Sequence, residues 1–510
     1  MTNIGVQSIP AFDFYMAPGI LKTFKKQFKQ IVYDYLELTD FDKFIAINGI
    51  EREIEKISTI DFDVSIFYKY CRESQELKRM FNISYKKALE KTNKITYQSM
   101  EAFIHNLNTV NSRIGGQAPL SSICFGTDTS PEGRMVCINF LEAMEAGIGN
   151  HETAKFPISI FKIKEGVNYL PQDANYDIFK RACEVSLDRG IITFEFLDSS
   201  FNKKFYSKNN YDTEVAYMGY RTRVMENMVD TSKEITPGRG ILSVTSINLP
   251  RIGIKNGTSL NGKANLNGFF QELEEKLDLV KDQLLERFEM QCSKKVYNFP
   301  FLLGQALWID SEKLKETDNL KKVLKQGTMS IGFTGLAECL KALTGKHHGE
   351  SKEAQELGLK IISFMREKCD KYSEKYNLNF SLTATPSGNL STDLIQMDQA
   401  IYGKIKNITD KEIYTDSFQL PKGYKISAEK KIEIEAPYHK LTNGGHITEI
   451  NLPEDAILSD FMKILAFDIG GTNIKYALCN EKFNITDRHT VPTEAEKGGQ
   501  ELVQKVIRII

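Results

Sequence analysis

The sequence predicts an α/β fold, and three observations lead to this prediction. Amphipathic segments of helical period alternate along the chain with short apolar runs that are typical of strands. The chain has 510 residues, of which 41% are hydrophobic and 26% charged, so it can bury a large core and is long enough for two or more domains. No internal repeat or low-complexity tract is evident in the sequence.

Two segments are predicted as amphipathic helices. In the first, which ends near Cys292, apolar residues recur at helical spacing: Phe270, Leu273, Leu277, Val280, Leu284 and Phe288. The second covers about residues 354–376. The basic run at residues 22–29 is predicted to be the solvated face of another helix.

Three short apolar runs are predicted as strands, because each is rich in strand-forming residues and has a Gly or Pro close by. They cover residues 158–161, 191–194 and 241–244. Strands that alternate with helices in this way indicate the α/β class.

Charge and hydropathy exclude several classes of partner. The formal net charge of −1 gives no overall attraction to nucleic acid or membrane, so any phosphate binding must come from local sites. No apolar run approaches the ~20 residues that a membrane span requires, and the N-terminus lacks the basic-then-apolar order of a signal peptide. We therefore expect a cytoplasmic protein without direct contact to membrane or nucleic acid.

The cysteines and histidines predict no metal site. The eight cysteines are scattered with no C-x-x-C pair, which argues against a disulfide framework and against a structural zinc ribbon. Free, mostly buried thiols are expected instead. His347 and His348 are followed by Gly349 and Glu350, but adjacent side chains diverge and no partner cluster is visible, so we expect an exposed loop there.

A series of short motifs extends from Gln7 to His446. One of them, at residues 211–224, contains a Met-Gly pair followed by Tyr220. The others are found, in chain order, at residues 7–13, 108–113, 115–119, 125–130, 248–251, 384–387, 414–418 and 438–446. Each motif alone is weakly specific, but their shared order and spacing resembles the oxygen-sensitive, glycyl-radical (class III) ribonucleoside-triphosphate reductases.

The resemblance implies the ten-stranded α/β barrel of glycyl-radical enzymes, with residues 211–224 as a finger loop threaded through its centre. In that family a cysteine follows the Met-Gly pair and becomes the thiyl radical that attacks the ribose. The implied reaction is the reduction of ribonucleoside triphosphates to deoxyribonucleoside triphosphates for DNA synthesis. The implied partners are a radical-SAM activating enzyme and a second copy in a homodimer, and the family uses a glycyl radical, a C-terminal zinc site and ATP or dNTP effectors.

The resemblance also assigns residues to the substrate. The substrate-binding residues that it implies are Asn111, Ser112, Arg113, Asn248, Thr385, Pro386 and Ser387. The last three precede a helical pattern, and the free backbone N–H groups of a helix start can bind a phosphate. The alternative for these three is an ordinary Ser/Pro turn that caps a helix.

Three residues depart from the family pattern. Tyr220 replaces the radical cysteine, and its phenol would project into the space for the ribose. Such a large-for-small change in a packed site also costs roughly 1–3 kcal/mol in strain. Ile241 stands at a position where the family typically carries an asparagine near the substrate. Val6 replaces the second residue of a Gly-Gly pair, and its β-branch disfavours the backbone angles that glycine allows.

We expect no turnover from this chain. The paired C-x-x-C zinc ligands and the Arg-x-x-Gly-Tyr segment of the family C-terminus do not occur in the sequence. The N-terminal nucleotide-sensing cone and the early barrel segment are also expected to be missing. No cofactor is therefore expected to be retained.

A second resemblance begins at Met462. Residues 463–478 form two apolar runs around a Gly-Gly turn, which resembles the opening β-hairpin of ROK-type sugar kinases in the actin-like ATPase fold. The phosphate-binding residues that this implies are Asp468, Gly470, Gly471 and Thr472. The alternative is a Gly-Gly hairpin turn without catalytic consequence. This fragment lacks the family's catalytic aspartate and zinc loop, so it is not expected to work as a kinase.

The expected domains are residues 1–455 as a partial reductase barrel, 456–461 as a junction and 462–510 as a kinase fragment. Three functions remain open. The chain is an anaerobic reductase by ancestry, or a catalytically silent remnant that still dimerises or binds nucleotide, or a sugar kinase fragment with an unrelated N-terminal extension.

Overall fold

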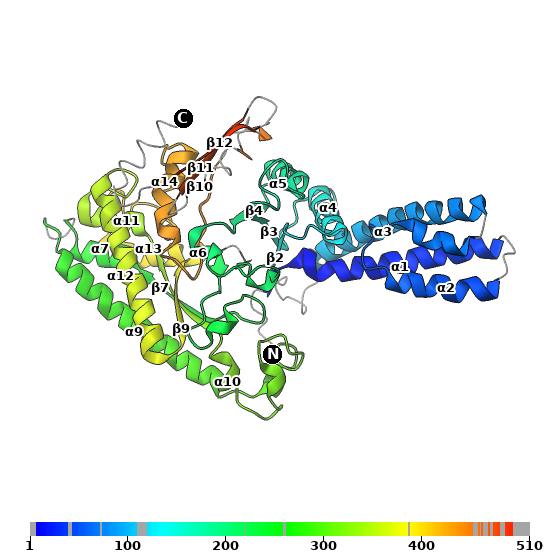
Figure 1. Ribbon diagram of the computed structural model, residues 1–510. Helices are drawn as coiled ribbons and strands as arrows, with labels where there is room; N and C mark the ends of the chain where they lie inside the picture. Colours follow the sequence, from blue (N-terminus) through cyan, green and yellow to red (C-terminus); the bar gives the residue numbers. More distant parts are fainter. Residues whose placement is uncertain are drawn as a thin grey trace. The chain divides into compact units, whose positions relative to one another are not determined.

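A computed structural model describes most of the chain. The described residues are 7–38, 43–71, 74–109, 120–219, 221–258, 262–385, 388–451, 457–458, 461–462, 468–469, 473–479 and 485–492. The chain divides into two compact units (Figure 1). We call residues 4–200 with 457–510 the first unit, and residues 1–3 with 201–456 the second unit.

The first unit combines a group of long helices with a parallel sheet. The helices α1, α2 and α3 lie side by side (Figure 1). The sheet has the strand order β1-β2-β3-β4, and all its neighbours are parallel. The elements are β1 (Gln7–Ile9), α1 (Phe12–Leu38), α2 (Lys43–Lys56), α3 (Gln75–Thr109), β2 (Ser121–Phe125), α4 (Pro131–Ala146), β3 (Ile158–Ile163), α5 (Tyr176–Arg189) and β4 (Ile192–Phe196), with a 3-10 turn at Val64–Tyr70.

The basic run at residues 22–29 lies on α1, as predicted. Its lysines are exposed or half-buried, whereas Phe24 and Phe28 are fully buried on the opposite side of the helix. The Phe28 ring contacts the ring of Phe67 with their centroids 5.4 Å apart. This aromatic packing explains why a run rich in lysine still forms part of the core.

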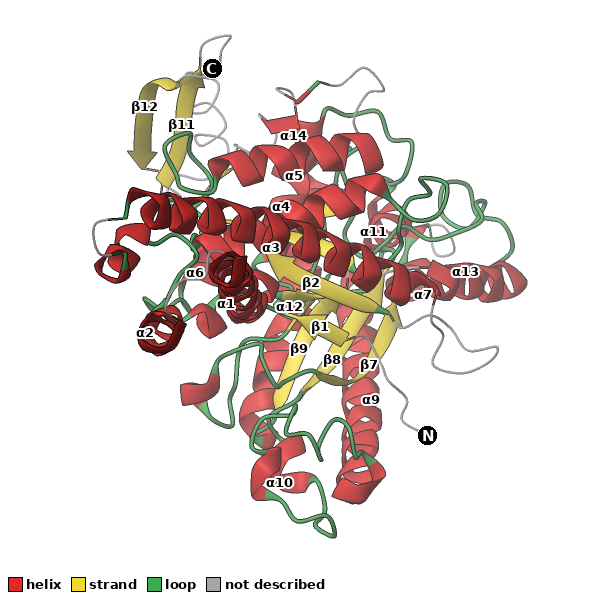
Figure 2. Cartoon of the chain, turned by 90° about the vertical axis from the view of Figure 1, so that its right-hand side faces the viewer, coloured by secondary structure: helices red, strands yellow, loops and turns green. Residues whose placement is uncertain are grey.

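The second unit is built on the parallel sheet β7-β8-β9, which Figure 2 shows beside the helices α9 and α12. The predicted helices and strands of this unit are confirmed, with ends that differ by a few residues. The elements are β7 (Ile241–Asn248), α7 (Leu249–Asn256), α9 (Leu266–Cys292), β8 (Thr328–Thr334), α11 (Leu336–Thr344), α12 (Lys352–Tyr376) and β9 (Asn379–Ala384). The strands predicted in the first unit are confirmed as β3 and β4.

The two faces of the β7-β8-β9 sheet differ in chemistry. Met329, Ile331 and Phe333 of β8 pack in the core with residues of α9, α11 and α12. Because side chains alternate along a strand, the residues between them point to the other face. We call it the hydroxyl face, and its residues are Ser246, Thr328, Ser330, Gly332, Thr334, Ser381, Thr383 and Thr385.

The α/β class is confirmed, but closure of a ten-stranded barrel stays a prediction. The described strands form parallel sheets of four and three strands, which belong to different units. The short antiparallel pair of β5 (Tyr217–Met218) and β6 (Thr222–Arg223) belongs to the second unit.

Shorter elements complete the described chain. In the second unit they are α6 (Ser200–Lys203), α10 (Lys321–Leu324), α13 (Gly388–Tyr402) and α14 (Ala428–His439), with 3-10 turns at Tyr211–Thr213, Thr231–Lys233, Val296–Asn298 and Ser311–Lys313. Near the C-terminus, β10 (Asp468–Ile469), β11 (Asn473–Cys479) and β12 (Ile485–Pro492) form an antiparallel sheet.

Two general expectations can be compared with the described residues. Seven of the cysteines are described as free and buried, which confirms the predicted buried thiols: Cys71, Cys124, Cys137, Cys183, Cys292, Cys339 and Cys369. None of the helices in the described part of the chain is both long enough and apolar enough to cross a membrane.

The loop predicted for residues 347–350 is confirmed, but its expected exposure is wrong for the two histidines. His347 is 5% and His348 is 2% exposed. His348 Nε2 lies 2.8 Å from the carbonyl oxygen of Phe418, and the ring of His347 contacts the ring of Tyr424 at 4.7 Å. These long-range contacts bury polar residues whose local sequence is typical of a loop.

Candidate functional site

The segment that carries Tyr220 forms a short hairpin in the second unit. Tyr217 of β5 pairs with Arg223 of β6, and Met218 pairs with Thr222. Gly219, with φ of 61°, takes a backbone conformation that favours glycine at the turn. Tyr220 itself lies outside the described residues. We call residues 217–223 the finger hairpin.

A segment at residues 443–446 joins the finger hairpin to the sheet. The backbone N–H of Arg223 donates to the carbonyl oxygen of Gly444 at 2.9 Å. On the other side, Gly444 N–H donates to Leu382 O at 2.8 Å, and Ala384 N–H donates to Gly445 O at 2.9 Å. This segment therefore lies between β9 and β6 and bonds to both.

Gly445 is required by this arrangement. Its φ is 117°, and a Cβ at this position would lie 1.7 Å from the backbone oxygen of Arg221. A backbone atom cannot move aside as a side chain can, so any other residue would displace the finger hairpin. The sequence motif at residues 438–446 does not reveal this contact with residues more than 200 positions earlier.

Two buried histidines complete the support of the hairpin. His446 Nε2 lies 3.2 Å from the hydroxyl of Tyr217, and its ring stacks on His439 with centroids 4.1 Å apart. Burial lowers the pKa of His439 to about 4. Burial, together with the nearby His439, Arg223 and Arg221, also holds the pKa of His446 well below its usual value. Both imidazoles are therefore neutral near pH 7.

Hydroxyl pairs link the strands on the hydroxyl face. Thr385 Oγ1 lies 2.8 Å from Ser246 Oγ, and Ser330 Oγ lies 2.7 Å from Ser381 Oγ. Gly332 lies between the first two: a Cβ there would be 2.0 Å from Thr385 Oγ1 and 2.5 Å from Ser246 Oγ. The Thr385 and Ser246 side chains thus meet over a residue without a side chain.

The start of α13 lies at the carboxyl end of this sheet. Ser391, in the first turn of α13, has its Oγ 2.9 Å from Thr334 Oγ1 at the end of β8. Thr385 follows the last residue of β9 and is 7% exposed. The predicted phosphate residues Pro386 and Ser387 lie outside the described residues. The carboxyl ends of parallel strands are the usual place for a ligand in an α/β sheet.

Both polar atoms of the Asn248 side-chain amide make hydrogen bonds within the protein. Its Oδ1 accepts from the backbone N–H of Arg251 at 3.2 Å and so caps α7, while its Nδ2 donates to Asp398 at 2.8 Å. Asp398 is fully buried and also accepts from Arg251 Nε at 2.5 Å and from the Tyr414 hydroxyl at 2.8 Å. In this structure Asn248 therefore connects β7 to α13, and its contact with a substrate stays a prediction.

Ile241 begins β7 and pairs with Thr328, which places both on the hydroxyl face at the amino end of the sheet. A register irregularity follows between Ile241 and Ser243. The side chain of Ile241 is half-buried. A polar residue at this position would point toward the same face as Ser330.

Arg239 is a buried residue whose role the sequence did not reveal. Its guanidinium donates to three backbone oxygens on two segments, at 2.8 Å to Gln326, 2.8 Å to Met225 and 2.9 Å to Glu226. Burial lowers its pKa to about 10, so the group remains charged near pH 7. Arg239 thus ties the chain that leaves the finger hairpin to the turn before β8.

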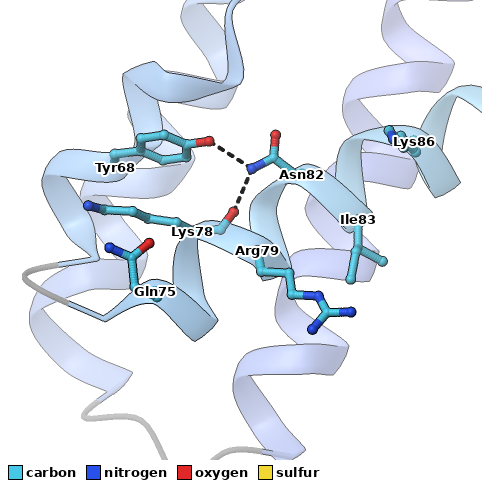
Figure 3. Close-up of a pocket in the computed structure, with 7 residues that line it drawn as sticks. All are labelled: Tyr68, Gln75, Lys78, Arg79, Asn82, Ile83 and Lys86. Atoms are coloured by element: carbon cyan, nitrogen blue, oxygen red, sulfur yellow. Dashed lines mark hydrogen bonds between the residues drawn. The ribbon is translucent and has the colours of Figure 1, made fainter.

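A separate open pocket lies beside α3 in the first unit. Figure 3 shows its residues: Tyr68, Gln75, Lys78, Arg79, Asn82, Ile83 and Lys86. The pocket has a volume of about 460 Å³. Asn82 Nδ2 donates to the Tyr68 hydroxyl at 2.7 Å, and Lys78 Nζ lies 5.8 Å from the centre of the Tyr68 ring. Three cations, an aromatic ring and two amides thus line one surface.

Several predicted site residues cannot be placed. Asn111, Ser112 and Arg113 lie outside the described residues, as do Gly470, Gly471 and Thr472. Asp468 is on β10, where its backbone pairs with that of Lys475. The predicted hairpin is thereby confirmed as antiparallel pairing, and its proposed contact with phosphate is untested.

Comparison with known proteins gives one consistent family. The profile of the family described as anaerobic ribonucleoside-triphosphate reductase matches residues 2–510. The reductase of that name from Salmonella typhimurium is 32% identical over 365 residues, 69% of this chain and 47% of the relative. The phage T4 reductase is 31% identical over 372 residues, 72% of this chain and 58% of the relative. The chain spans about half the length of such curated relatives.

Solved structures agree on the fold. The anaerobic ribonucleotide reductase of Thermotoga maritima in complex with dATP and CTP has a TM-score of 0.52 and 15% identity, over 95% of this chain and 91% of that chain. The same enzyme with citrate in its active site has a TM-score of 0.51 and 15% identity, over 74% of this chain and 63% of that chain. At such low identity the likeness concerns the fold alone.

Proposed function

The chain belongs to the anaerobic ribonucleoside-triphosphate reductase family, and on this premise we propose that its second unit binds a ribonucleoside triphosphate without reducing it. The observation that carries this proposal is the hydroxyl face of the β7-β8-β9 sheet with the start of α13 at its carboxyl end. Val244, which shares that face on β7, is 44% exposed, so part of the face is open.

The phosphates are proposed to bind at the start of α13. This helix has 15 residues, so its first turn presents free backbone N–H groups and a favourable dipole to an anion. The hydroxyls of Thr385 and Ser391 flank that turn and are paired with Ser246 and Thr334. A hydroxyl that already has one partner can still donate or accept a further hydrogen bond, so both remain suitable for phosphate oxygens.

Two residues are the reason why we propose that the bound nucleotide is not reduced. Tyr220 stands where the family carries the radical cysteine, and a phenol cannot supply the thiyl that abstracts the ribose hydrogen. Ile241 removes the polar group that the family places on the face where Ile241 and Thr328 pair. The proposed setting for both is the family's barrel with the finger hairpin in its interior.

The partners and cofactors of the family are only proposals for this chain. A radical-SAM activating enzyme, a homodimer, a glycyl radical and effector nucleotides are what this family implies for the complete system. The described part of the chain contains no cluster of three His, Cys, Asp or Glu side chains that could hold a metal ion. No step of the proposed function is assigned to zinc.

An anaerobic binding and turnover assay tests this function. The chain is mixed with a matching activating enzyme and radiolabelled ribonucleoside triphosphate, and bound nucleotide and deoxynucleotide are both measured. We expect saturable binding and no deoxynucleotide above a no-enzyme control, also after Tyr220→Cys. Deoxynucleotide from the unmodified chain would refute the absence of reduction, and absence of binding would refute the nucleotide site.

A second nucleotide site is proposed in the α3 pocket of Figure 3. Its lysines and arginine suit phosphate oxygens, and the Tyr68 ring suits a base. The Thermotoga maritima structure, which contains two different nucleotides, gives a precedent for more than one site. Lys78→Ala with Lys86→Ala should weaken dATP binding by about tenfold, whereas Lys94→Ala, on the same helix outside the pocket, should not. Equal effects of the two changes would refute this site.

A kinase-like origin of residues 462–510 is the remaining proposal. Its support is the antiparallel pairing of β10 with β11, which agrees with the predicted hairpin. The reductase profile extends to residue 510, so it also covers this segment. ATP binding that is lost in Asp468→Asn would favour the kinase-like origin, and unchanged ATP binding would contradict it.

A further inference from the structure

We infer that Tyr217 and His446 are a positioning pair that fixes the finger hairpin against β9. The two side chains belong to segments 229 residues apart, and their polar atoms lie 3.2 Å from each other. Tyr217 is 8% and His446 is 8% exposed, so water competes little for this hydrogen bond. The functional meaning of the pair rests on the proposed function, in which this hairpin presents the residue at position 220.

The hydrogen-bond pattern fixes which nitrogen of His446 carries the proton. Nδ1 lies 3.3 Å from the carbonyl oxygen of Thr442, which can only accept, so Nδ1 must donate. The Thr442 hydroxyl, 3.1 Å from the same nitrogen, donates its own hydrogen to Tyr438 O and therefore also accepts from Nδ1. In the neutral ring Nε2 is then an acceptor, and the Tyr217 hydroxyl is its donor.

The environment keeps the His446 ring neutral and in place. Its ring stacks on His439 with an interplanar angle of 13°, and the ring of Phe201 packs against it in a T-shaped arrangement with centroids 5.5 Å apart. His439 in turn has its Nε2 3.0 Å from Thr448 Oγ1. Burial between these groups disfavours a charged imidazole, which agrees with the lowered pKa values of both histidines.

The same segment also holds the second strand of the hairpin. Arg223 donates its backbone N–H to Gly444 O and its Nη1 to Asn443 O at 3.1 Å. Residues 443–446 therefore contact β5 through His446 and β6 through Asn443 and Gly444. Gly444 and Gly445 also bond to β9. Because β5 is paired with β6, loss of the Tyr217–His446 bond should loosen the whole hairpin on this segment, Arg223 included.

Amide hydrogen exchange at Arg223 tests this inference, because that amide is bonded to Gly444. Loss of one buried hydrogen bond should raise the local opening equilibrium by about fivefold. We expect this increase for Tyr217→Phe and for His446→Leu, with exchange in α12 unchanged. His446→Gln, which keeps an acceptor, should stay within about twofold of the unmodified chain.

Tyr424→Phe is the matched control. The Tyr424 hydroxyl donates to Gly349 O at 2.8 Å and its ring contacts His347, yet these residues make no contact with the finger hairpin that the structure records. Exchange at Arg223 should not change in this variant. The double variant Tyr217→Phe with His446→Leu should match His446→Leu alone, because that change has already removed the bond to Tyr217. Additive effects, or an equal effect of Tyr424→Phe, would overturn the inference.

The tautomer gives a readout that a purely packing role would not affect. Nitrogen NMR of histidine-labelled protein should show His446 neutral and protonated at Nδ1, with a shift of its Nε2 signal in Tyr217→Phe. A ring protonated at Nε2, or an Nε2 chemical shift that is the same in Tyr217→Phe, would overturn the inference. Both outcomes can be observed even if His446→Leu fails to fold. These results do not depend on nucleotide binding, so they are separate from the failure or success of the proposed function.

Discussion

The two parallel sheets of this protein share a topology but differ in the face opposite the one that packs in their main hydrophobic cores. In the first unit, Lys162 of β3 and Glu195 of β4 are paired neighbours on that face and are 1% and 4% exposed. In the second unit the corresponding face carries hydroxyls, and Val244 of β7 is 44% exposed. One sheet thus buries charges on this face, whereas the other presents small neutral groups and stays partly open. The comparison shows why the second sheet is the better candidate for a ligand site.

Removal of the buried lysine in the first sheet should cause the largest loss of stability. Lys162→Met removes a buried cation whose neighbour across the two strands is the buried Glu195, and we expect the free energy of unfolding to fall by about 3–5 kcal/mol. Lys162→Met with Glu195→Leu should recover most of this loss, because no buried charge remains at either position. Denaturant unfolding measures both values. A loss below about 1 kcal/mol in the single variant would contradict the account of this face.

Gly445→Ala should have the next largest effect, because a Cβ there would lie 1.7 Å from the backbone oxygen of Arg221. We expect a loss of about 3 kcal/mol or more in unfolding free energy, from the positive φ and the clash together. Gly403→Ala is the matched control, since its φ is 73° but nothing lies within 4 Å of its Cβ. It should cost only about 1 kcal/mol. Equal losses would mean that the finger hairpin is not held at Gly445.

Acid should destabilise the second unit. Burial lowers the pKa of His348 to about 3 and of His439 to about 4, and the pKa of His446 lies well below its usual value. Their stabilising contribution is complete above pH 6.5 and is lost as pH falls toward these values, because the unfolded chain then binds more protons. Between pH 7 and 5.5 each histidine should cost about 1 kcal/mol.

Glu435 has the opposite effect on the free energy of unfolding as the pH falls. Burial raises its pKa to about 6, so this carboxyl favours the folded state below that pH. A pH series of urea unfolding should therefore show a net loss that is smaller than the sum of the three histidines. His348→Leu should flatten the curve by about 1 kcal/mol over this range. An unfolding free energy that rises on acidification from pH 7 to 5.5 would contradict the neutral buried histidines.

The last and smallest change in binding compares the two faces of the β7-β8-β9 sheet. Thr385→Val removes the hydroxyl that lies 2.8 Å from Ser246 on the open face, and we expect nucleotide binding to weaken by about fivefold with less than about 1 kcal/mol lost in stability. Thr245→Val, whose hydroxyl contacts Gln283 of α9, should leave nucleotide binding unchanged. Calorimetric titration measures both. If Thr245→Val weakened binding as much, the open face would not be the binding face.

Much of the fold could be predicted because it depends on local patterns. The apolar period of residues 266–292 and 352–376 reports the buried side of a helix, and the run at 158–163 reports a strand in a core. The chemistry of the hydroxyl face could not be predicted, because it depends on which strands become neighbours. Ser246 and Thr385, for example, are 139 residues apart.

The support of the finger hairpin was missed for the same reason. His446, Gly445 and Arg239 bond to residues far away in the chain, and none of these contacts leaves a periodic signal in the sequence. The buried His347 and His348 show the reverse error, since a polar run was interpreted as exposed although Phe418 and Tyr424 cover it. Short motifs therefore indicated the family correctly but not which of their residues hold the structure together.

Amide hydrogen exchange, measured with and without a ribonucleoside triphosphate, tests whether the open sheet face binds the nucleotide. With nucleotide present, we predict slower exchange in the first turn of α13 and at the carboxyl ends of β7, β8 and β9, and no change in β3 or β4. Protection in the α3 pocket alone, or no protection in either unit at saturating nucleotide, would contradict the claim that the open sheet face binds the substrate.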